Sequence, residues 1–231
     1  MLVPRFYLLG VLIIGSFSVR AQTSGGIIEN YLNAIGGKEK IDSIKTIVFK
    51  TSTDNPFGKS SATIFSKRNN KYRIEMSYRD GRKTINCFNG SKYTGSNRKV
   101  VEMLENYPSK VPPILFFSDL FFVPEQELQL LPPEKLNGTD CHVLSFCEEV
   151  WDRSYKYYFN AYTHLLIAEE NNLLVKSYKD RVLYEDYQSV KGILIPMREV
   201  IENDGQRYTT QYTEIILNPE LQDDIFECDP E

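Results

Sequence analysis

From Thr46 onward, apolar and polar residues alternate along the chain with a period of two, interrupted at short intervals by polar turns. This alternation is typical of β-strands, because successive side chains of a strand point to opposite faces. Pairs such as Asp80-Gly81, Asn137-Gly138 and Asn171-Asn172 predict tight turns between antiparallel strands. The predicted strands cover residues 46–52, 61–66, 72–78, 83–88, 141–148, 154–160, 165–170, 181–190, 193–203 and 206–217, and a further strand is expected from about residue 129.

Three stretches follow a helical rather than a strand period. Apolar residues recur at helical spacing between residues 27 and 35, and Gly36-Gly37 supplies a stop signal. A second short helical turn is expected at 39–44, and 99–107 is a further helix candidate. The pattern therefore predicts a short helical start followed by a long run of hairpins.

The segment 114–122 is the most apolar stretch after the N-terminal region, with seven large apolar residues out of nine, and Pro112-Pro113 precedes it. Proline is well tolerated at the start of a helix, so a short helix is expected here. A helix that is apolar on all sides must be covered by protein or face another apolar group. Two interpretations stay open: a helix that fills the core of the sheet, or a lid for an apolar ligand cavity. The candidate ligand-binding residues are Leu115, Phe116, Phe117, Leu120, Phe121 and Phe122.

Aromatic residues support a large sheet. The chain contains 15 Tyr and 13 Phe but a single Trp, and Tyr and Phe favour strands because their rings pack well on a pleated surface. We find no linker, repeat or low-complexity segment. The expected fold class is mainly β (α+β), with one large curved antiparallel sheet and a few helices, as a single domain over residues 22–231.

The first 21 residues have the features of a secretion signal. Arg5 precedes the apolar core 6–17, and Val19-Arg20-Ala21 provides small or short side chains at the cleavage positions. An apolar run of this length is too short to span a bilayer, which needs roughly 20 residues. We therefore expect cleavage after Ala21 and a soluble periplasmic product. No cysteine follows the cut, so no lipid anchor is expected there.

The remaining chain is acidic. Without Arg5 and Arg20, 25 of the 27 basic residues stand against 31 acidic ones, a formal net charge of −6. A nucleic acid or an anionic membrane surface attracts proteins with excess positive charge. We expect neither as a partner, and we expect a monomer.

Four cysteines, Cys87, Cys141, Cys147 and Cys228, allow three pairings in an exported protein. Cys141 and Cys147 lie six residues apart in one predicted strand, roughly 20 Å apart at about 3.3 Å per residue, so they cannot bridge. Two alternatives stay open for the cysteines: disulfides between other pairs, and free buried thiols. Neither a CxxC motif nor a paired-histidine motif points to zinc.

Catalytic chemistry has little support. His142 and His164 lie in strand patterns without partners that resemble a triad. The acidic pairs Glu148-Glu149, Glu169-Glu170 and Asp223-Asp224 are adjacent, and adjacent residues of a strand point to opposite faces. We interpret them as solvated positions or turns. No motif for nucleotide, phosphate or metal binding is present, so we expect neither an enzyme nor a cofactor.

Three segments resemble the LolA-like proteins. Tyr184-Glu185-Asp186-Tyr187 followed by the V-K-G-I-L-I-P run at 190–196 resembles their late hairpin. The segment 215–226 resembles their closing strand and tail, and 31–41 resembles the first helix of Bacteroidetes-type members. The resemblance implies an open half-barrel of roughly eleven antiparallel strands, with helices covering its concave face.

The resemblance also implies a function. Carriers of this superfamily shelter acyl chains in an apolar cavity, so the leading hypothesis is a periplasmic carrier or binder of lipid or lipidated protein. A membrane protein is a possible donor or acceptor of the cargo. The alternative is a periplasmic sensor or interaction module on the same fold, and a hydrolase using scattered carboxylates is the third. The carriers' arginine that latches the lid has no match in this sequence, so no residue receives that role.

Overall fold

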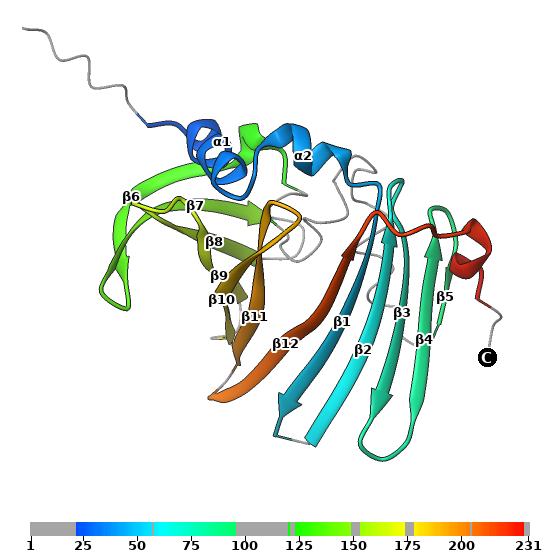
Figure 1. Cartoon of the computed structure of the whole chain (residues 1–231). Coiled ribbons are helices and arrows are strands. Elements are labelled where there is room, and N and C mark those ends of the chain that lie inside the picture. Colours follow the sequence, from blue (N-terminus) through cyan, green and yellow to red (C-terminus); the bar gives the residue numbers. More distant parts are fainter. Residues whose placement is uncertain are drawn as a thin grey trace, which may run out of the picture.

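The computed structural model describes residues 22–56, 58–95, 120, 123–148, 153–173, 178–203 and 205–228. Within them the chain forms one twelve-stranded antiparallel sheet in the order β5-β4-β3-β2-β1-β12-β11-β10-β9-β8-β7-β6. Nearly every strand pairs with its neighbour in sequence. In the described sheet, the pairing between strands that are not consecutive in sequence is that of β12 with β1, which joins the two halves of the sheet (Figure 1). Because β5 and β6 end the order without pairing to each other, the described sheet is open, as expected.

The elements, in chain order, have the following bounds: α1 Ser24–Ala34, α2 Lys38–Ser43, β1 Thr46–Asn55, β2 Gly58–Lys67, β3 Lys71–Tyr78, β4 Lys83–Asn89, β5 Tyr93–Thr94, η3 Glu125–Glu127, β6 Gln129–Leu136, β7 Thr139–Glu148, β8 Arg153–Asn160, β9 Leu166–Leu173, β10 Tyr178–Val190, β11 Ile193–Asn203, β12 Gln206–Leu217 and η5 Asp223–Phe226. The predicted signal segment, the helix at 99–107 and most of 114–122 lie outside the described residues.

All predicted strands are present, with two differences. The two-residue strand β5 was not predicted. The expected turn at Asn171-Asn172 is wrong: both residues lie within β9, where they pair with Asp180 and Lys179 of β10. Long cross-strand pairing outweighs the local turn preference of asparagine. Pro132 lies in β6 at a register shift, and as an edge strand β6 tolerates the missing donor.

The helices dock against one end of the sheet (Figure 1). α1 begins at the N-cap Thr23, whose hydroxyl accepts a hydrogen bond from the Gly26 amide (3.1 Å). Just after α1, the Leu194 amide donates to the Ile35 carbonyl (2.8 Å). Gly36 sits at φ 137°, and a Cβ there would lie 2.7 Å from the Gly192 carbonyl oxygen. A glycine at position 36 is therefore needed for the helix to approach the β10–β11 turn.

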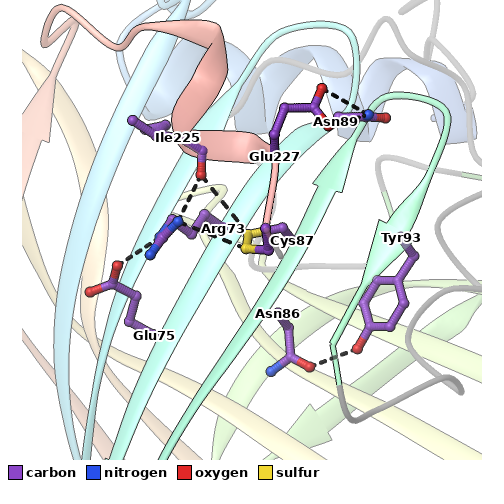
Figure 2. The surroundings of a disulfide bond; sticks show 9 residues. Arg73, Glu75, Asn86, Cys87, Asn89, Tyr93, Ile225 and Glu227 are labelled. Carbon is purple, nitrogen blue, oxygen red and sulfur yellow. Dashed lines mark hydrogen bonds and ion pairs between the residues drawn. A yellow bond between two sulfur atoms is a disulfide. The ribbon is translucent and has the colours of Figure 1, made fainter. Parts of the chain in front are cut away.

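The C-terminal segment is fastened to β3 and β4 (Figure 2). Cys87 on β4 forms a disulfide with Cys228, with a Cα–Cα distance of 5.8 Å. The Arg73 guanidinium also donates to the Ile225 carbonyl (3.0 Å). Cys141 and Cys147 carry free thiols on the single strand β7. The prediction that these two do not bridge is confirmed.

Candidate functional site

The sheet has an inner and an outer face. We call the face that carries Ile47 and Phe49 the inner face, because both side chains join the core formed with the two helices. Strand register places further residues on the same face, in rows across the sheet. Starting at the helix end, the rows are Leu217, Ile47, Ser66, Tyr72 and Phe88; Ile215, Phe49, Ile64, Ile74 and Asn86; Tyr212, Thr51, Ala62, Met76 and Thr84; and Tyr184, Glu199, Thr210, Thr53, Ser60 and Tyr78.

At the helix end, the inner face is filled by protein side chains. Ile27, Tyr31 and Ile35 of α1 are buried there, and the Tyr31 ring meets Phe159 edge-on at a centroid distance of 5.7 Å. Leu120 joins this core with 2% of its surface exposed. This end therefore serves mainly to attach the helices to the sheet.

Of the six predicted ligand-binding residues, the structure describes Leu120 alone. It is buried in the core at the helix end. Leu115, Phe116, Phe117, Phe121 and Phe122 lie outside the described residues, so their role as a lid stays a prediction.

A polar group lies on the inner face among aromatic rings. Glu199 of β11 faces Tyr184 of β10 in the register, and the Tyr212 hydroxyl of β12 donates to Glu199 Oε1 (2.5 Å). Phe49 packs edge-on against the Tyr212 ring at 5.5 Å. Burial raises the pKa of Glu199 from 4.5 to about 7, although the Tyr212 hydrogen bond lowers it. Its protonated form is therefore favoured relative to that of an exposed glutamate.

Toward the opposite end, the inner face becomes accessible. Ala62 and Ile64 of β2 and Ile74 and Met76 of β3 are only half-buried, although all four are apolar and face inward. They form an apolar strip between the helix-covered core and the free end of the sheet, and we call these four residues the inner strip. A surface of this kind can accept an apolar ligand without displacing the core.

A pocket of about 600 Å³ lies at that free end, where three hairpin turns meet. These turns join β1 to β2, β3 to β4 and β11 to β12, and they lie at the far end of the sheet from the helices (Figure 1). The lining residues are Asn55, Gly58, Lys59, Ser60, Tyr78, Arg79, Asp80, Arg82 and Tyr208. The Tyr78 hydroxyl donates to Met76 Sδ (3.6 Å), so the pocket borders directly on the inner strip. Pockets of this volume are typical of small-ligand sites.

The two histidines lie near each other. His142 is on β7 and His164 lies in the connection between β8 and β9, and burial, followed by the charge of His164, lowers the pKa of His142. No group of three histidine, cysteine, aspartate or glutamate side chains suited to a metal ion occurs among the described residues. Within the same ranges, no helix is long and apolar enough to cross a membrane.

The interpretation of the acidic pairs as solvated is wrong for Glu170. Its side chain is buried on the outer face, with 4% exposed, and accepts two hydrogen bonds from Arg181 at 2.6 and 2.9 Å. Tyr158 also donates to Glu170 (3.2 Å). A buried carboxylate needs such partners to offset the loss of hydration. The role of this pair is structural, because Glu170 and the inner strip lie on opposite faces.

The described fold is that of the LolA-like proteins. No family model and no curated protein sequence matches the chain. A LolA superfamily protein from Nitrosomonas europaea is similar in structure at 15% identity and a TM-score of 0.60, with 90% of this chain and 99% of that chain covered. A DUF1329 family protein from Desulfovibrio piger follows at 12% identity and a TM-score of 0.56, covering 89% and 98%. A putative outer membrane lipoprotein-sorting protein domain from Vibrio parahaemolyticus has 11% identity and a TM-score of 0.53, covering 88% and 97%. The fold implied by the sequence resemblance is thus confirmed, with twelve strands rather than eleven.

Sequence reasoning missed the pocket and Glu199. The pocket residues come from three turns that are far apart in the sequence, and each turn by itself is an ordinary polar hairpin. One signal was available: Tyr78 at the end of β3 and Tyr208 near the start of β12 each lie next to a turn with charged residues. Glu199 interrupts the apolar inward-facing positions of β11, which is the local sign of an inward-facing carboxyl.

Proposed function

We propose that this protein is an exported, soluble binder of lipid or lipidated protein that holds acyl chains non-covalently on the inner face of its sheet. The observation that carries the proposal is the inner strip, a half-buried apolar surface that runs from the helix-covered core to the pocket at the free end. The LolA-like fold supports it, as does the similarity to the domain described as a putative outer membrane lipoprotein-sorting protein domain.

Energetics support non-covalent binding. Each buried methylene group contributes about 0.8 kcal/mol, so a chain of a dozen or more carbons binds firmly through burial alone. Such binding requires no cofactor and no catalytic residue. We therefore propose a binding protein rather than an enzyme.

Two features support export to the periplasm. The first 21 residues carry the pattern of a cleaved secretion signal. The Cys87–Cys228 disulfide suits an oxidising compartment, because disulfides are rare in reducing cytosol. A carrier in that compartment would receive its cargo at one membrane and deliver it to a partner at another.

The proposal is tested by displacement of the neutral fluorescent probe N-phenyl-1-naphthylamine with hexadecanol. The wild-type protein is expected to bind the probe and to release it to hexadecanol. Met76→Asp places a charge on the inner strip, and the cost of covering that charge with an acyl chain is expected to weaken hexadecanol binding at least about tenfold.

Ile85→Asp is the matched control. Ile85 lies on the neighbouring strand β4, is 37% exposed and faces outward, so this variant is expected to bind hexadecanol as the wild type does. A wild-type protein that takes up neither compound, and that carries no lipid on native mass spectrometry after purification from cell envelopes, would contradict the proposal. Attention would then turn to a protein partner.

A further inference from the structure

The pocket at the free end carries an excess of positive charge in a chain whose overall charge is negative. Lys59, Arg79 and Arg82 line it against the single carboxylate of Asp80. The formal net charge of the whole chain is −4. A local reversal of sign in a concave site concentrates anions there, since the surrounding walls focus the field.

The exposed Arg79 side chain lies against the backbone of the adjoining turn. Its stem crosses Gly58, where a Cβ would lie 3.0 Å from Arg79 Cδ. Gly58 therefore lets the arginine stem lie flat across the β1–β2 turn. Among the residues that the structure describes, no carboxylate lies within 4.0 Å of the Arg79 guanidinium. Its charge is thus available to a ligand.

The other charged residues of the pocket are partly neutralised. Arg82 pairs with Asp80 (2.7 Å) and holds the pKa of that carboxyl below its ordinary value. The Arg82 guanidinium also lies over the Tyr78 ring, 4.9 Å from its centroid. Lys59 makes only a long contact of 4.0 Å with Asp54 and stays largely exposed. Register places Lys59 beside Asp54 on the outer face. Arg79 is therefore the cation best placed to meet an anion.

We propose that this pocket binds the anionic headgroup, a carboxylate or phosphate, of an amphiphile whose acyl chain lies along the inner strip. The inference rests on the proposed function and adds the chemical class of the ligand. Tyr78 joins the two parts of the site, since its ring lies under Arg82 and its hydroxyl contacts Met76. An amphiphile bound in this way has its charged end at the free end of the sheet and its tail toward the helices.

The test compares ligands with one tail and different headgroups. Hexadecanoate, hexadecyl phosphate and hexadecanol each displace N-phenyl-1-naphthylamine from the full-length mature protein. In the variant Arg79→Gln, affinity for both anionic ligands is expected to fall about tenfold, because a charge-assisted contact is lost. Affinity for hexadecanol is expected to change less than about twofold.

A gain of affinity is expected from Asp80→Asn. The substitution removes the one carboxylate of the pocket and releases Arg82, while asparagine keeps the Oδ1 acceptor that bonds the Arg82 amide (3.1 Å). Affinity for hexadecanoate is expected to rise about threefold, and the rise is expected to shrink in high salt.

Lys83→Gln/Arg207→Gln is the control for total charge. Both residues are exposed near the same end of the sheet, but register places them on the outer face. This variant removes two positive charges without touching the pocket, so the affinity for all three ligands is expected to stay within about twofold of the wild type.

Several outcomes overturn the headgroup proposal. Equal loss of affinity for hexadecanol and hexadecanoate in Arg79→Gln would make this cation structural. If inorganic phosphate competes with hexadecyl phosphate as strongly as hexadecanoate does, the pocket is a free-anion site. If the variant binds vesicles of anionic phospholipid more weakly than the wild type does, while its affinity for hexadecanoate is unchanged, the cation makes a membrane contact. Failure of hexadecanol to displace the probe from the wild type, by contrast, contradicts the proposed function itself.

Discussion

Replacing Cys228 with serine is expected to lower the free energy of unfolding by about 2–5 kcal/mol. The disulfide joins residues 141 positions apart, so it removes much of the conformational freedom of the unfolded chain. The chain-entropy model assigns about 5 kcal/mol to a loop of this size. The loss is measured by urea denaturation of the oxidised wild type and the variant at one pH.

Cys147→Ser is the control for this measurement, because Cys147 is exposed and carries a free thiol. Its free energy of unfolding is expected to stay within about 0.5 kcal/mol of the wild type. Thiol titration of the denatured, unreduced wild type is expected to detect Cys141 and Cys147 alone. Two further thiols, or a Cys228→Ser variant as stable as Cys147→Ser, would contradict the role of the bridge.

The bridge also holds the C-terminal segment on the outer face. Phe226 is buried with 1% exposed, and the Glu227 carboxylate accepts hydrogen bonds from the Asn89 amide at 2.9 and 3.0 Å. Lys67 and Lys71 pair with Asp223 and hold the pKa of that carboxyl below its ordinary value. Because these contacts surround the bridge, Cys228→Ser is expected to expose β3 and β4 amides to hydrogen exchange before the rest of the sheet.

The second large effect concerns pH. Glu199 has a pKa of about 7 in the folded protein against an ordinary value of 4.5, so the fold favours the protonated form. The contribution of Glu199 to the free energy of unfolding is therefore expected to be largest below pH 4.5. Its contribution is lost as the pH rises toward 7, by about 3 kcal/mol in all. Urea denaturation between pH 4.5 and 8 measures this loss.

Variants separate Glu199 from other titrating groups. Glu199→Gln keeps an acceptor for the Tyr212 hydroxyl but cannot ionise, so the free energy of unfolding is expected to vary less with pH between 4.5 and 7. Tyr212→Phe removes the hydrogen bond that lowers the pKa of Glu199, so the loss is expected to extend to higher pH.

Glu214→Gln is the matched control on β12, since Glu214 is 47% exposed and pairs with Lys50 across the outer face. It is expected to retain the wild-type dependence on pH. The phenols Tyr184, Tyr187 and Tyr212 face Glu199, and burial raises the pKa of Tyr187 and Tyr212 well above the ordinary value, so these two stay neutral in this range. A Glu199→Gln profile identical to the wild-type profile would contradict the assignment.

The strands were predictable because their signals are local. An alternating strand such as 193–203 and an Asn-Gly turn such as Asn137-Gly138 each follow from neighbouring residues, and β11 and the β6–β7 turn lie where expected. Predictions failed where distant pairing decided the outcome. Asn171 and Asn172 form strand rather than turn because β10 pairs with them, and Glu170 is buried because Arg181 of another strand reaches it.

The candidate site was less predictable than the fold. Apolarity alone selected the segment around Leu120, and Leu120 itself lies in the core. The pocket needs Lys59, Arg79 and Tyr208 from three turns, and only the register of the sheet brings those turns to one end.

The sequence by itself thus determined the class of fold, the hairpin order and the exclusion of a Cys141–Cys147 bridge, since each depends on contacts between near neighbours in the chain. The tertiary structure alone decided the pairing of Cys87 with Cys228, the raised pKa of Glu199 and the cationic pocket beside the inner strip. These three features depend on burial and on the field of residues far apart in the sequence. Both are set only when β12 pairs with β1 and joins the two halves of the sheet.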